Sequence, residues 1–127
     1  MRRLRIPTLA LAAALAWTCS PVHAAELSEE DTAVIESLQS QGVDLTQPRL
    51  VEFLFSFQSV RPARQVGKTL AAEGFQNSID PGGGGKDVLL LARKHVVLTP
   101  ADITALRARF EALAKSAGGQ YEGWGLP

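Results

Sequence analysis

The stretch Arg49–Ser59, RLVEFLFSFQS, sets the expected fold of this 127-residue chain. Its large apolar side chains recur at every second position, which is the spacing of a β-strand with one buried face. The residues on that face are Val51, Phe53, Phe55 and Phe57. Three phenylalanines in a row could also form a stacking platform for bases or sugars, but such rows more often belong to a core. Leu54 on the opposite face indicates that this second face is also partly covered.

Helices and strands are expected on both sides of this strand. Proline at helix starts and glycine after helix ends mark several boundaries. The expected elements are a helix over Ser28–Gly42, the strand Arg49–Ser59, a helix over Arg61–Gly74, a short polar strand over Phe75–Asp80, a strand over Lys86–Leu98, a helix over Thr99–Gly119 and a last strand over Gln120–Gly125. This order predicts an α+β fold of the ferredoxin-like split βαβ type, a four-stranded antiparallel sheet with two helices on one face. The helix over Ser28–Gly42 is an extra N-terminal element.

The same periodicities predict the core between the sheet and its two helices. Its members are Phe53, Phe55, Val66, Leu70, Ile103, Leu106, Phe110 and Leu113. The other face of the sheet is left for solvent, for the N-terminal helix or for a partner. The only concentration of basic residues is predicted at Arg93, Lys94 and His95 together with Arg107 and Arg109. These residues are interpreted as solvated, with contact to a small anion or an acidic segment as the alternative.

The first 24 residues have the three-part pattern of a secretory signal peptide. Three arginines lie within the first five residues, the run Leu9–Trp17 is apolar, and Ala24 offers a small residue for cleavage. A transmembrane helix needs about 20 apolar residues, more than this run provides. A first core helix of a cytosolic domain would not explain the order of the three parts. The sequence predicts that residues 1–24 are removed and that residues 25–127 form one periplasmic domain.

Cys19 raises the alternative of a lipoprotein, but Ala16-Trp17-Thr18 puts bulky residues where a lipidation signal needs small ones. Cleavage after Ala24 leaves no cysteine, and therefore no disulfide, in the mature chain. It also removes three of the thirteen basic residues, which leaves ten against thirteen acidic residues and a net charge near −3. Such a charge argues against a nucleic-acid-binding surface.

Motifs that would support catalysis are weak. The run Gly82–Lys86, GGGGK, resembles a phosphate loop, but its spacing is wrong and it precedes a strand instead of a helix. It is interpreted as a hairpin loop. His95 is the only histidine beyond the predicted signal peptide, too few for a zinc site, and no serine lies in an elbow-type motif. We expect no catalytic residue, no metal and no cofactor; the alternative is a small hydrolase with a cleft near His95.

The C-terminal run Tyr121–Gly125, YEGWG, holds the only tyrosine and one of the two tryptophans. Gly123 allows the backbone to bend, so Tyr121 and Trp124 need not point to alternate faces. Each aromatic ring has a polar tip that needs a hydrogen-bond partner when it is buried. The run can close the sheet as a last strand, contact a partner, or do both.

This ending resembles the Tyr-Asp-Gly-Trp-Gly motif of the regulator of ribonuclease E activity B family. The resemblance extends back through the last helix and the segments VLLLARKHVVLTPADI, ARQVGKTLAAEGF and VEFLFSF to the acidic first helix, over about residues 29–125. It implies a ferredoxin-like domain that binds the C-terminal scaffold part of ribonuclease E and inhibits it without being an enzyme. Two features depart from the family pattern: Glu122 stands where aspartate is usual, and a signal peptide precedes the domain although ribonuclease E is cytoplasmic.

The sequence therefore predicts a non-catalytic, regulatory protein-binding domain. Its predicted partner-binding residues are Tyr121, Glu122, Gly123 and Trp124. The partner implied by the resemblance is ribonuclease E, or another protein in the exported compartment. Direct contact with nucleic acid and a membrane span are not expected. An envelope structural module is a further alternative.

Overall fold

The computed structural model describes residues 27–82 and 86–127. The predicted signal peptide with its cleavage site, Cys19, and the centre of the glycine run lie outside these residues. The elements are α1 (Glu29–Ser40), β1 (Arg49–Phe57), α2 (Val60–Ala71), β2 (Gln76–Asp80), β3 (Val88–Val96), α3 (Pro100–Ser116) and β4 (Gln120–Gly125). In the described part of the chain, no helix is both long and apolar enough to cross a membrane.

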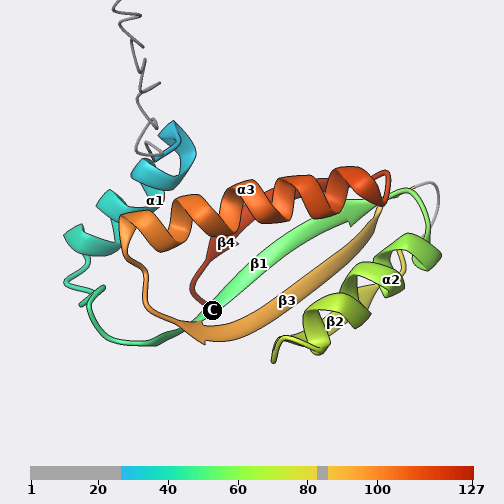
Figure 1. Ribbon diagram of the computed structural model, residues 1–127. Helices are drawn as coiled ribbons and strands as arrows, with labels where there is room; N and C mark the ends of the chain where they lie inside the picture. Colours follow the sequence, from blue (N-terminus) through green and yellow to red (C-terminus); the bar gives the residue numbers. More distant parts are fainter. Residues whose placement is uncertain (1–26, 83–85) are drawn as a thin grey trace, which may run out of the picture.

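The four strands form one antiparallel sheet in the order β2-β3-β1-β4 (Figure 1). β1 lies between β3 and β4, and it pairs with β3 along its full length, from Arg49 opposite Val96 to Phe57 opposite Val88. β1 and β2 run parallel with β3 between them, and β3 and β4 run parallel with β1 between them. This arrangement confirms the predicted split βαβ fold of the ferredoxin-like type.

α2 and α3 cover the same face of the sheet (Figure 1), and the phenylalanine row of β1 is buried beneath them. The ring of Phe110 on α3 meets the rings of Phe53 and Phe55 edge-on, at centroid distances of 5.0 and 5.3 Å. The row is therefore core and not a stacking platform. The predicted core residues that are buried are Phe53, Phe55, Val66, Leu70, Ile103 and Phe110. Leu106 and Leu113 are only partly buried because they lie on the flank of the stripe that α3 turns to the sheet.

Short polar side chains fix the starts of α1 and α3. The Ser28 hydroxyl accepts a hydrogen bond from the Asp31 N–H at 3.1 Å, and the Thr99 hydroxyl accepts one from the Asp102 N–H at 3.2 Å. Such bonds satisfy N–H groups that have no partner within the helix. α2 differs, since in the described structure its N-cap Ser59 makes no side-chain hydrogen bond to the helix.

A β-bulge in β4 decides where the C-terminal run points. Tyr121 lies opposite Phe55 and Gly123 lies opposite Leu54, so Glu122 is an extra residue without a partner on β1. Gly123 has φ +129°, a conformation that favours glycine. The bulge puts Tyr121 and Trp124 on the same face of the sheet, that of the helices, although they are three positions apart. The expectation that these two rings do not alternate is confirmed.

Candidate protein-binding site

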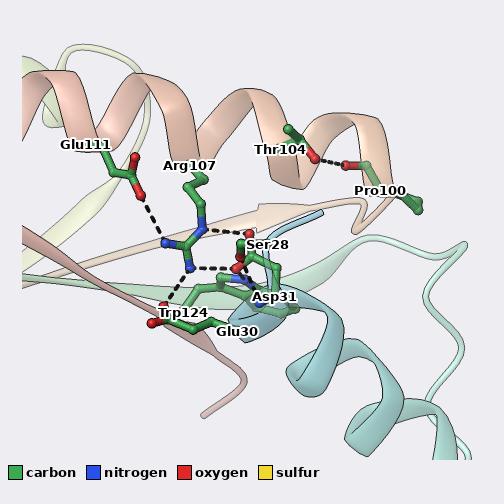
Figure 2. Close-up of polar contacts among 8 residues, drawn as sticks. All are labelled: Ser28, Glu30, Asp31, Pro100, Thr104, Arg107, Glu111 and Trp124. Carbon is green, nitrogen blue, oxygen red and sulfur yellow. Dashed lines mark hydrogen bonds and ion pairs between the residues drawn. The ribbon is translucent and has the colours of Figure 1, made fainter. Parts of the chain in front are cut away.

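A buried ion pair joins α1 to α3 next to the C-terminal run (Figure 2). The Nε and Nη2 atoms of Arg107 donate to Oδ2 and Oδ1 of Asp31 at 2.7 and 2.9 Å. The side chain of Asp31 is 1% exposed and that of Arg107 16%. Glu30 and Glu111 accept further hydrogen bonds from the same guanidinium. Paired, bidentate hydrogen bonds are the geometry in which a buried charge is best satisfied.

The two aromatic residues of the C-terminal run complete this arrangement. The indole N–H of Trp124 donates to Oδ1 of Asp31 at 2.8 Å (Figure 2). The guanidinium of Arg107 lies 5.4 Å from the centroid of the Tyr121 ring, which also packs against Phe110. We call Asp31, Arg107, Tyr121 and Trp124 the buried charge cluster. Both aromatic side chains are therefore engaged in contacts inside the molecule.

The cluster shifts the pKa values of its members. Burial by itself raises the pKa of Asp31, but the hydrogen bonds from Arg107 and Trp124 outweigh it, and the net pKa lies below 3.8. The hydrogen bond to Asp31 raises the pKa of Arg107 above its usual range. Burial raises the pKa of Tyr121 above its usual value. At neutral pH the cluster therefore holds one full ion pair and a neutral phenol.

Glu122 lies on the other side of the sheet. Its carboxylate accepts a hydrogen bond from the hydroxyl of Ser56 at 2.6 Å. Along β1, Ser56 alternates with the buried Phe55 and Phe57, so it lies on the other face of the strand. α2 and α3 do not cover that face of the sheet (Figure 1), which we call the open face. The partly exposed leucines Leu54, Leu89 and Leu91 lie on the same face. The structure thus brings Tyr121 and Trp124 together and separates Glu122 from them.

On the open face, β4 has two positions without a side chain, because both are glycine. Gly123 lies opposite Leu54, and Gly125 lies opposite Glu52. A Cβ atom at either glycine would meet no other atom of the described structure within 4 Å. Glu52 is paired across the strands with Arg93, whose Nε donates to it at 2.8 Å. The open face therefore presents partly exposed leucines flanked by glycines and polar groups.

The residues singled out for other chemistry do not come together in the described structure. His95 is exposed near the end of β3, opposite Leu50, and its side chain makes no hydrogen bond to the residues described. Within residues 27–82 and 86–127, no group of three or more histidine, cysteine or acidic side chains is arranged to hold a metal ion. The run Gly82–Lys86 leads from β2 into β3, so it joins a hairpin and does not start a helix.

One of the basic residues that were predicted to be solvated is buried instead. The interpretation of Arg107 as a solvated residue is wrong, because it is mostly buried and bound to Asp31. Arg109 is 44% exposed and pairs with Glu73, so it does lie at the surface. The prediction of a single basic concentration is also wrong, because Arg61, Arg64 and Lys68 form a row on α2 whose helical spacing is visible in the sequence.

Comparison with protein families gives one match over nearly the whole described structure. The model of the family described as "Regulator of ribonuclease activity B" matches residues 28–126. The matched segment begins at the N-cap of α1 and includes every helix and strand, the buried charge cluster and the open face. Comparison with curated proteins gives no significant match.

Proposed function

The chain belongs to the regulator of ribonuclease activity B family, and on this premise we propose that it regulates a ribonuclease by binding it, without catalysing a reaction itself. The observation that carries this proposal is the extent of the family match, which includes the complete ferredoxin-like fold and the C-terminal run. Among the described residues, His95 has no nucleophile beside it. No observation therefore favours the alternative of a small hydrolase. Ribonuclease E is the first candidate for the partner.

In this proposal the partner contacts the open face, with Glu122 as the charged residue of the contact. Glu122 is exposed, and its only described side-chain hydrogen bond is the one from Ser56. It can pair with a basic partner such as the arginine-rich scaffold of ribonuclease E. Tyr121 and Trp124 support the contact indirectly, because they hold β4 against the helices.

The proposal also includes export of the mature chain to the periplasm. It is supported by the basic, apolar and small-residue pattern of residues 1–24. The partner would then be another protein of the exported compartment, and ribonuclease E would be the partner of any chain kept in the cytoplasm. Intact-mass measurement of the protein from each fraction should show Ala25 at the N-terminus in the periplasm. Retention of residues 1–24 would contradict export, and an acylated Cys19 would contradict cleavage after Ala24.

Binding to the purified C-terminal scaffold segment of ribonuclease E tests the regulatory role directly. We expect saturable binding and slower RNA cleavage by the enzyme. Glu122→Gln should weaken binding without altering thermal unfolding, because glutamine can still accept from Ser56. Glu36→Gln on α1 is the matched control, since it removes the same charge from another exposed position. A folded protein that neither binds the scaffold segment nor slows cleavage would contradict the proposal.

A further inference from the structure

The outer surface of α2 carries basic residues that make no contribution to the packing of the fold. Arg61, Arg64 and Lys68 are three and four positions apart, so they lie on one side of the helix. All three are exposed, as is Gln65 between them. In the part of the chain that the structure describes, none of the three takes part in an ion pair. We call Arg61, Arg64 and Lys68 the basic stripe.

The basic stripe differs from Arg93 and Arg109, which both form ion pairs within the molecule. Arg93 pairs with Glu52, and Arg109 pairs with Glu73. The acidic residues of the segment 60–80 are Glu73, which is already used by Arg109, and Asp80, which takes part in no ion pair of the described structure. No described ion pair therefore neutralises the stripe.

Charge is also segregated along the molecule. α1 and α2 lie at opposite ends of the helical layer (Figure 1). The exposed residues of α1 include Glu29, Glu30 and Glu36, whereas α2 has no acidic residue. An open depression of about 540 Å³ is lined by Val60, Gln65 and the three residues of the basic stripe. A local positive surface thus exists on a mature chain whose net charge is negative.

We propose that the basic stripe is a docking surface for an acidic segment of a protein partner. Its three cations span seven positions of the helix, or roughly 10 Å at 1.5 Å per residue. An extended chain covers that length with about three residues, so a short acidic run is sufficient. Carboxylates suit the two arginines because they can bind a guanidinium in bidentate fashion. Nucleic acid is the less suitable occupant, since the phosphates of a longer strand would extend beyond the three cations of the stripe.

This contact is separate from the one proposed at Glu122. α2 covers the face of the sheet that lies opposite the open face (Figure 1). The two surfaces also have opposite charge and select different segments of a partner. The inference rests on the proposed function in one respect only, namely that the partner is a protein.

Fluorescence anisotropy with a short labelled glutamate-rich peptide tests the inference. A lysine-rich peptide and a single-stranded RNA of equal length serve as comparison probes. The double variant Arg64→Gln/Lys68→Gln should bind the acidic peptide about tenfold more weakly than the natural chain, because two charge-assisted contacts are lost. Lys86→Gln/Lys115→Gln is the matched control, since it removes two exposed cations elsewhere. The control should bind within about twofold of the natural chain, and circular dichroism should show both variants folded.

Three outcomes would overturn the inference: no binding of the acidic peptide, equal losses in both double variants, or tighter stripe-dependent binding of the RNA. The same proteins are then tested on the scaffold segment of ribonuclease E. Stripe-dependent peptide binding without scaffold binding would reject the proposed function and retain this inference. Scaffold binding without any peptide binding would reject this inference and retain the proposed function.

Discussion

α1 and α2 each have 12 residues, yet they use charge in opposite ways. α1 begins at the hydrogen-bonded cap Ser28 and has three acidic residues in its first turn, which suits the positive end of the helix dipole. α2 begins at Ser59, whose side chain makes no cap hydrogen bond in the described structure, and its first charges are Arg61 and Arg64. The N-terminus of α2 therefore carries charges of the sign that a helix dipole disfavours.

The difference separates charge that maintains the fold from charge that is available for a partner. Asp31 of α1 is buried and bonded to Arg107 and Trp124, so its loss should reduce stability. The basic stripe of α2 is exposed and makes no described ion pair, so its loss should change binding and leave stability nearly unchanged. Each half of this comparison can be tested separately.

The largest effect is expected for Arg107→Ala, which leaves the carboxylate of Asp31 buried without its cation. Removing one partner of a buried pair typically costs about 3–5 kcal/mol. Urea unfolding should show a loss in that range. The double variant Asp31→Leu/Arg107→Met should regain much of it, because an apolar pair avoids the cost of burying charge. A loss below about 1 kcal/mol for Arg107→Ala would mean that the cluster does not hold α1 in place.

A smaller loss is expected for Trp124→Phe, which keeps an aromatic ring but removes the indole N–H that binds Asp31. Leaving a buried acceptor with fewer donors costs about 1–3 kcal/mol. Tyr121→Phe is the control, since the described structure shows no side-chain hydrogen bond from the Tyr121 hydroxyl, and its unfolding free energy should change by less than about 0.5 kcal/mol. Equal stabilities for the two variants would show that the hydrogen bond from Trp124 contributes nothing.

The buried charge cluster also makes stability depend on pH. The pKa of Asp31 is lower in the folded chain than in the unfolded chain, so its contribution is complete above the unfolded value, about 3.9. It is lost as pH falls below that value, because the unfolded chain then binds the proton more readily. The free energy of unfolding should therefore decrease less steeply from pH 6 to pH 3 for Asp31→Leu/Arg107→Met than for the natural chain. Arg64→Gln/Lys68→Gln should keep the natural slope.

The sequence was sufficient to predict the fold because the relevant signals are local. The alternation in Arg49–Ser59 identifies β1 from a few neighbouring positions, and Thr99 with Pro100 marks the start of α3. Gly123 likewise indicated that β4 is not a regular strand. These signals depend on the backbone and on which face of an element is apolar, so they persist in the folded chain.

The buried charge cluster was missed because its pairing is not local. Arg107 and Asp31 are 76 positions apart, and their contact depends on how α1 packs against α3. A signal did exist in each helix. Arg107 lies between Ile103 and Phe110 on the buried side of α3, and Asp31 lies four positions before the buried Ile35. Opposite charges on the apolar sides of two helices predict a buried pair, but reasoning from α3 alone assigned Arg107 to solvent.

The smallest effect, and the one that tests the comparison of α1 and α2 most directly, is expected for Arg61→Glu. An acidic residue in the first turn of a helix is favoured by the dipole by about 0.3–1 kcal/mol, so this variant should unfold at slightly higher urea concentration. It should also bind the glutamate-rich peptide more weakly, because one cation of the basic stripe becomes an anion. Lys86→Glu makes the same charge change outside any helix and should not stabilise the protein. A gain in stability together with a loss of binding would show that α2 keeps Arg61 for contact with a partner, whereas a loss of stability would show that Arg61 supports the fold, as Asp31 does in α1.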